Sequence, residues 1–163
     1  MTTDALPAPR LSARELSVWR TFLRAYAIIN ARLEHDLFDA HELPLPWYEV
    51  LVHLAEAPAQ RMRMTDLADR VLLSRSGLTR LVDRLESEGL VKRAACPSDA
   101  RGTFTVLTAA GQHRLRQAAP TYLHGVGEYV ATPLSGAELG VLHELLVRLL
   151  DAAGGDPRPA VAP

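Results

Sequence analysis

The sequence predicts a mainly α-helical fold that contains one small β-hairpin. Apolar residues recur at three- and four-residue steps over residues 11–40 and again over 136–152, which is the spacing of one helix face. Between residues 90 and 108 the period changes to two, and Thr103 and Thr105 alternate with apolar neighbours as in a half-buried strand. Helices on both sides of a single hairpin are therefore expected.

Three more helix boundaries can be placed ahead of the hairpin. The prolines of "ELPLPW" end the first helix, because proline disfavours helix in the residue before it, and a second helix follows over 46–57. We expect "APAQRMRM" to be an irregular connector. Thr65 is then expected to cap a short helix over 66–71, and Ser74 to cap the next helix over 75–88.

The chain after the hairpin is expected to be helical again. Pro120 should kink or divide a helix over 109–131, because an interior proline removes a backbone donor. Ser135 and Glu138 have the spacing of a capping box at the start of the last helix, over 136–152. Helix, helix, short helix, helix, hairpin, helix, helix is a winged helix-turn-helix arrangement with additional helices at both ends.

The charge is distributed unevenly. The 163 residues carry a formal net charge of −1, yet residues 61–101 hold nine Lys and Arg against six Asp and Glu. A locally basic segment in an otherwise acidic chain is typical of nucleic-acid binders. With 48% apolar and 23% charged residues, the composition is that of one ordinary globular domain.

Other features of the chain point to a cytoplasmic protein. Cys96 is the only cysteine, so no intrachain disulfide can form. The first residues lack a cationic segment followed by an apolar run, and no stretch is apolar enough to span a membrane. Both ends, 1–10 and 153–163, are rich in Pro, Ala and Gly and are expected to be disordered.

The helix over 75–88 has two unlike faces. Its apolar residues fall on one side of a helical wheel. These are Leu78, Leu81, Val82 and Leu85. The other side presents short polar residues and arginines, which suits a helix that enters the major groove of DNA. Arg80 is the best candidate for reading a base, since a guanidinium pairs bidentately with guanine. Asp83 could accept from cytosine or orient Arg80. The alternative is an ordinary surface helix.

Cations on the hairpin favour DNA binding over that alternative. Lys92 and Arg93 lie at its base and Arg101 at its far end, where they can reach phosphate or a minor groove. Asp99 is close enough in sequence to hold Arg101 in place. The hydroxyls near the start of the helix suit phosphate, helped by the helix N-terminus. The full set of predicted DNA-binding residues is Thr65, Ser74, Arg75, Ser76, Thr79, Arg80, Asp83, Arg84, Lys92, Arg93, Ser98, Asp99 and Arg101.

The segment "MTDLADRVLLSRSGLTRLVDRLESEGLVKRAACPSDARGTFTVLTAAG" resembles the DNA-binding region of the MarR family of bacterial transcription regulators. The most specific matches are "LTRLVDRLESEGLVKR" and "DARGTFTVLTAAG". The likeness extends from about residue 11 to 151. Two features depart from the family pattern: the turn "RVLLS" lacks the usual glycine, and Pro120 is unusual in the fifth helix.

The resemblance implies a homodimer that binds a pseudo-palindromic double-stranded DNA operator. Residues 46–108 would form the winged helix-turn-helix region, and 11–45 with 109–152 would interlock between subunits. The alternative is that the terminal helices pack within one chain. The family also uses a cleft for small aromatic or phenolic effectors, so the expected function is a repressor released by such a ligand. Residues that could line the cleft are Tyr26, Asn30, Trp47 and Tyr48, although aromatics at helical spacing are often plain core.

Other functions have weaker support in the sequence. No phosphate-binding glycine loop, nucleophile elbow or paired carboxylates are present, so we expect no enzyme, no catalytic residues and no cofactor. No His and Cys have metal-ligand spacing, so no metal site is expected. A redox- or metal-responsive regulator of the same fold, for example through Cys96 or His35 with His41, stays an alternative. A helical adaptor that never contacts DNA is a further one, of a different class.

Overall fold

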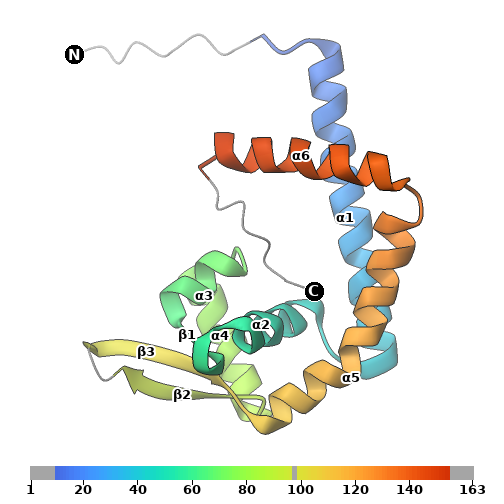
Figure 1. Ribbon diagram of the computed structural model, residues 1–163. Coiled ribbons are helices and arrows are strands. Elements are labelled where there is room, and N and C mark those ends of the chain that lie inside the picture. Colours follow the sequence, from blue (N-terminus) through green and yellow to red (C-terminus); the bar gives the residue numbers. More distant parts are fainter. Residues whose placement is uncertain (1–9, 97–98, 155–163) are drawn as a thin grey trace, which may run out of the picture.

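The computed structural model describes residues 10–96 and 99–154, and it is mainly helical with a small antiparallel sheet, as predicted. Figure 1 shows a lobe formed by α2, α3, α4 and the sheet, with the long α1, α5 and α6 to one side. The helices are α1 (Ala13–His41), α2 (Leu45–Glu56), α3 (Met64–Arg70), α4 (Arg75–Ser87), α5 (Ala109–Val126) and α6 (Gly136–Ala152). The strands are β1 (Arg61–Arg63), β2 (Val91–Cys96) and β3 (Asp99–Leu107).

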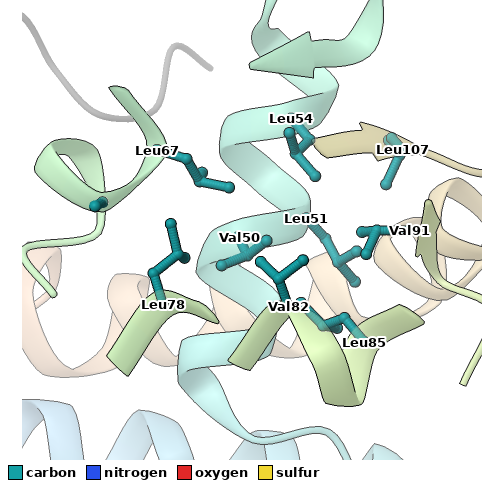
Figure 2. Packing of buried hydrophobic residues seen from close by; sticks show 10 residues of the cluster. Val50, Leu51, Leu54, Leu67, Leu78, Val82, Leu85, Val91 and Leu107 are labelled. Carbon is teal, nitrogen blue, oxygen red and sulfur yellow. The ribbon is translucent and has the colours of Figure 1, made fainter. Parts of the chain in front are cut away.

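The lobe has one hydrophobic core, and residues of α2 lie at its centre (Figure 2). Figure 2 shows Val50, Leu51 and Leu54 of α2 surrounded by side chains from α3, α4 and the sheet. The surrounding buried residues are Leu67, Leu78, Val82, Leu85, Val91 and Leu107. Three of the four apolar residues predicted on one face of α4 are therefore fully buried, and Leu81 packs against them while partly buried.

A second core joins the lobe to the long helices. Its buried members come from α1, α2, α5 and the segment between α1 and α2. They are Leu33, Leu37, Leu43, Leu45, Tyr48, Val52 and Ala118. Trp47 is partly buried and packs against both cores, so its side chain connects them.

The expected irregular connector is wrong in part, because its end forms a third strand. A short 3-10 turn, η1 (Pro58–Gln60), leads into β1, which pairs antiparallel with β3 through Arg61↔Val106, Met62↔Thr105 and Arg63↔Phe104. The strand order is β1-β3-β2. In a three-residue strand only Met62 points to the core side, so the sequence carries too little alternation to reveal it.

The helix-turn-helix differs from prediction at the start of α3. The helix begins at Met64, with Arg63 as its N-cap residue, so Thr65 lies inside the first turn and does not cap the helix. The Thr65 hydroxyl instead donates to Asp66 Oδ1 at 3.1 Å. Ser74 caps α4 as predicted, since its hydroxyl oxygen accepts from the Gly77 N–H at 3.1 Å.

The turn between α3 and α4 compensates for its missing glycine with a strained leucine. Leu72 adopts a left-handed conformation with φ 53°, and its side chain is 87% exposed. Left-handed backbone costs a residue with a Cβ about 1–2 kcal/mol. The turn is nevertheless closed by the Leu73 N–H, which donates to the Ala68 carbonyl at 3.1 Å.

The helices after the sheet follow the predicted order with one difference. Of the two effects expected of Pro120, division of the helix does not occur: α5 is continuous to Val126, and the difference from prediction is that the chain then forms a π-helical turn, η2 (Gly127–Ala131). The α5 ribbon changes direction partway along its length in Figure 1, as an interior proline would cause. Ser135 and Glu138 form the predicted capping box at the start of α6. None of the described helices has the length and apolarity needed to cross a membrane.

Gly111 permits the close approach of α5 to the sheet. A Cβ at this position would lie 2.1 Å from the Leu90 carbonyl oxygen and 2.8 Å from Leu107 Cδ1. The neighbouring Thr108 hydroxyl donates to the same Leu90 carbonyl at 2.9 Å and accepts from the Gly111 N–H at 3.0 Å. The backbone contact leaves no flexible side chain that could move aside.

We therefore expect Gly111→Ala to lower the free energy of unfolding by about 1–3 kcal/mol through overpacking. Gly136 is a matched control, because it also lies in the first turn of a helix and a Cβ there meets nothing within 4 Å. Gly136→Ala should leave stability within about 0.5 kcal/mol of the parent. Urea denaturation followed by circular dichroism measures both, and equal stabilities for the two variants would contradict the packing argument.

Candidate nucleic-acid interface and effector cavity

The face of α4 that points away from the core is polar and exposed. Arg75, Ser76, Thr79, Arg80 and Arg84 are all exposed. Some hydroxyls on this helix are already used locally: the Thr79 hydroxyl donates to the Arg75 carbonyl at 2.8 Å, and the Ser74 hydroxyl lies 3.3 Å from that of Ser76. An exposed α4 carrying three arginines is available for groove or phosphate contacts.

Arg93 connects the sheet to α4. Its guanidinium donates to Asp83 Oδ1 at 2.6 Å and forms a second ion pair with Glu86. Its backbone N–H also donates to Glu86 Oε1, at 2.9 Å. Burial acts to lower the pKa of Arg93, but the hydrogen bonds and charges of Asp83 and Glu86 together outweigh it and raise the pKa. Two residues predicted to contact DNA, Arg93 and Asp83, thus bind each other.

The contact of Asp83 with Arg93 bears on the two roles considered for Asp83. Its carboxylate is engaged by a guanidinium from β2, and the hydrogen bonds of the described residues include none between Asp83 and Arg80. Arg80 itself is exposed. The arrangement therefore leaves Arg80 unrestrained by its helical neighbour and holds β2 against the C-terminal half of α4.

A groove of about 430 Å³ lies between the start of α3, the start of α4 and the sheet. Among the residues that the structure describes, its lining contains three arginines and no carboxylate. The lining residues are Arg63, Met64, Thr65, Arg75, Thr79, Arg93, Gly102 and Thr103. Cations with adjacent hydroxyls are the groups that hold a phosphodiester. The structure thus brings Thr65, Arg75, Thr79 and Arg93 from the predicted set together in one place.

The remaining predicted residues lie on the hairpin. Lys92 is exposed on β2. Ser98 lies outside the described residues. Asp99 and Arg101 belong to β3 by their backbone, but their side chains lie outside the described part of the structure. The predicted roles of these three residues remain predictions.

Two arginines on β1 were missed by the sequence analysis. The Arg61 and Arg63 guanidinium carbons lie 4.8 and 5.6 Å from the centre of the Phe104 ring. Arg63 Nη2 also donates to Cys96 Sγ at 3.2 Å, and Cys96 is buried. The signal in the sequence was the Arg-Met-Arg alternation, which places both cations on one side of a strand. They add positive charge to the sheet beside the groove.

A second cavity, of about 430 Å³, lies where α1, α2 and α5 meet the turn of the helix-turn-helix. Tyr26, Asn30 and Tyr48 line it as predicted for an effector cleft, whereas Trp47 is absent from the lining and packs between the two cores. The other lining residues are Glu34, Leu45, Pro46, Glu49, Val52, His53, Arg70, Val71, Leu72, Leu73 and Tyr122.

Burial shifts the pKa values of several residues in this lining. It raises the pKa of Tyr48 to about 12, with smaller contributions from Tyr122 and Glu56. It also raises the pKa of Glu49, with the charge of Glu34 adding to the effect. His53 shifts the other way, because burial and then the charge of Arg70 lower its pKa. His53 is therefore neutral at pH 7, and Tyr48 and Tyr122 keep their protons.

His53 has a buried polar atom without a partner. The side chain is only 5% exposed, and its Nδ1 has no hydrogen-bond partner among the described residues. A buried unsatisfied nitrogen of this kind destabilises a fold and is often found at a functional site. Elsewhere, no group of three or more His, Cys, Asp or Glu in the described ranges could hold a metal ion.

The fold and the exposed polar α4 beside a basic sheet define a DNA-binding winged helix-turn-helix protein. A family model described as MarR family matches residues 41–102. Sco3205, a MarR family transcriptional regulator from Streptomyces coelicolor solved in complex with DNA, aligns with a TM-score of 0.84 and 36% identity over 90% of this chain and 92% of its own. The chain therefore belongs to the MarR family of transcriptional regulators, as its motifs suggested.

Further relatives agree with this assignment. AbsC, a MarR family regulator from Streptomyces coelicolor, has a TM-score of 0.83 and 34% identity, covering 91% of this chain and all (100%) of AbsC. The HTH-type transcriptional regulator MhqR from Bacillus subtilis (strain 168) is 28% identical over 141 residues, which span 85% of this chain and 93% of MhqR. The likeness therefore includes the helices at both ends.

Arg93 is expected to stabilise the lobe through its two carboxylates. Because the carboxylates are partly exposed, solvent screening limits the gain, and a double-mutant cycle of Arg93→Met with Glu86→Gln should give a coupling energy of about 0.5–1 kcal/mol. Urea denaturation of the four proteins measures it. Lys92→Met, at the neighbouring exposed position, should change stability by less than about 0.5 kcal/mol. A coupling energy indistinguishable from zero would mean that the ion pair between Arg93 and Glu86 does not stabilise the fold.

Proposed function

We propose that this MarR family protein is a homodimeric, sequence-specific DNA-binding repressor that a small aromatic ligand releases from its operator. The observation that carries the proposal is the exposed face of α4 next to a groove whose described lining includes Arg63 and Arg75. A helix of this kind fits the major groove, which is about 12 Å wide, while cations beside it bind the backbone.

The roles divide between reading bases and binding phosphate. Arg80 is exposed in the middle of α4, where a groove-bound helix would present it to base edges. Arg75 and Thr79 line the groove beside the sheet and would contact a phosphate. Arg93 acts differently from the sequence expectation: its ion pairs make it a residue that positions β2 against α4. The related Sco3205 is solved in complex with DNA, which supports DNA binding by this chain.

The homodimer is supported by apolar surface that one chain leaves uncovered. No residue of α6 is buried, although one side of the helix is apolar, with Val141, Leu145 and Leu149 each at least 48% exposed. The first half of α1 is similar, with Trp19, Phe22, Leu23 and Tyr26 exposed. Exposed large apolar side chains along two helices are typical of a protein interface. A second copy provides the matching surface and places two α4 helices on one duplex.

The effector role of the cavity follows from its position. Its lining joins α1, which belongs to the proposed dimer interface, to Leu72 and Leu73, which lead directly into α4. A ligand between them would set the spacing of the two recognition helices. It releases DNA only if it binds more tightly to the spacing that does not fit the operator.

DNA binding with a steep salt dependence tests this function. On DNA from upstream of its own gene, Arg80→Ala should lower affinity by about 1–3 kcal/mol and relax sequence preference, because one base contact is lost. Arg101→Ala should weaken binding to all sequences alike and reduce the salt slope, as loss of a phosphate contact does. Gel-shift titrations at several salt concentrations measure both effects.

Arg14 provides the control for this experiment, as an exposed arginine on α1 far along the chain from the lobe. Arg14→Ala should change neither affinity nor specificity. Equal loss of specificity from Arg80→Ala and Arg101→Ala would contradict the assigned roles. Absence of salt-sensitive binding to any DNA would favour the adaptor alternative.

The dimer is tested by a charge in the α6 surface. Leu145→Glu should raise the dimer dissociation constant at least about tenfold, because an unpaired carboxylate would be buried at the interface. Leu72→Glu is the matched control, since Leu72 is more exposed than Leu145 but lies in the helix-turn-helix. Analytical ultracentrifugation over a concentration series distinguishes them. If Leu145→Glu sediments like the parent, α6 does not form the interface.

A further inference from the structure

The effector cavity has a chemical character that narrows the class of ligand it accepts. We propose that it binds an organic cation, an amine on an aromatic or apolar body, with the ammonium between Glu34 and Glu49 and against tyrosine rings. The inference rests on the proposed effector role of this cavity and replaces the unspecified aromatic ligand with a positively charged one. Two properties of the lining carry it: its carboxylates and its aromatic rings.

The carboxylates come from two helices and converge on one side of the cavity. Glu34 belongs to α1 and Glu49 to α2, and both line the cavity. They are near enough for the charge of Glu34 to raise the pKa of Glu49 in addition to the effect of burial. Neither has an ion-pair partner in the part of the chain that the structure describes. A bound cation would relieve the repulsion between two such carboxylates and favour their charged forms.

Three tyrosines line the same cavity. Tyr48 and Tyr122 lie with ring centroids 4.6 Å apart, and Tyr26 adds a third ring from α1. Tyr122 is placed next to the acidic side, because its pKa is raised by burial and then by the charge of Glu49. Aromatic faces attract cations through the negative charge of the ring face. Rings combined with carboxylates are the groups that recognise organic ammonium ions.

The described lining also contains a cation. Arg70 is the lining's single guanidinium; it stands at the end of α3, is exposed to solvent, and acts on His53. His53 contributes no positive charge, because its pKa is lowered. The described lining therefore holds two carboxylates, of which Glu34 is exposed like Arg70, against one guanidinium. An aromatic carboxylate would enter a cavity of its own charge, whereas an amine would complete the charge balance.

The rest of the lining fits the apolar body of such a ligand. Val71, Leu72 and Leu73 also line the cavity, at the turn that leads into α4. An ammonium held by α1 and α2 would thus place apolar atoms against the exposed Leu72. The ammonium group would determine which ligands bind, and the apolar part of the ligand would act on α4 through the turn before it.

The proposal is tested with three probes that share one ring system and differ in charge: naphthylmethylamine, naphthylmethanol and naphthoate. Isothermal titration calorimetry on the full-length protein should show the amine binding at least about tenfold more tightly than the alcohol, and naphthoate more weakly than either. Glu34→Gln should remove most of the amine's advantage while leaving the affinity for the alcohol unchanged. Glu34 is exposed on α1, so the variant is expected to fold.

Asp39→Asn is the matched control, because it removes a carboxylate from the same helix outside the cavity lining and should change none of the three affinities. A preference for naphthoate, no binding of the amine, or undiminished amine binding by Glu34→Gln would each overturn the proposal. DNA binding is measured separately by gel shift. Intact DNA binding without amine preference would reject only the cation, whereas loss of DNA binding would reject the proposed function itself.

Discussion

The rest of the structure depends on the burial of α2 from two sides. Val50, Leu51 and Leu54 fill the core of the winged lobe, while Tyr48 and Val52 belong to the core shared with α1 and α5. Protein interiors are close-packed, so a helix with both sides buried cannot shift without repacking both cores. The lobe that carries α4 is consequently attached to the long helices through a rigid element. The effector cavity lies along this same helix, where a bound ligand would meet that attachment directly.

Local signals made much of the fold predictable from the sequence. The apolar spacing of Leu78, Val82 and Leu85 indicated which face of α4 is buried, and Ser74 marked where the helix begins. Such features depend on neighbours within one helical turn. The strand β1 was missed because its pairing partners lie more than forty residues away in β3 and only three residues take part. Thr65 was misplaced as a cap because hydroxyl residues favour caps in general, and the start of α3 is set by the sheet next to it.

The candidate site was less predictable, since side chains chosen for their chemistry also interact with one another. The sequence showed Arg93 and Asp83 as charges suited to DNA, but it could not show that they pair across β2 and α4. It likewise gave no reason to associate Glu34 with Glu49, which come together only when α1 packs on α2. Tyr26, Asn30 and Tyr48 were placed in the cavity by family resemblance, whereas Trp47 was drawn into the cores by its size. Long-range packing decides such partnerships, and one sequence does not record it.

The uncovered apolar side of α6 has a consequence for how the protein survives in a cell. If α6 becomes buried by association with a second copy, as proposed, the folded population would fall as the protein is diluted. Regulators are commonly needed in few copies, and scarcity would then favour unpaired chains that proteases can degrade. Operator DNA that holds two copies together would protect them. The amount of protein in the cell, its rate of degradation and its occupancy of the promoter would then depend on one another.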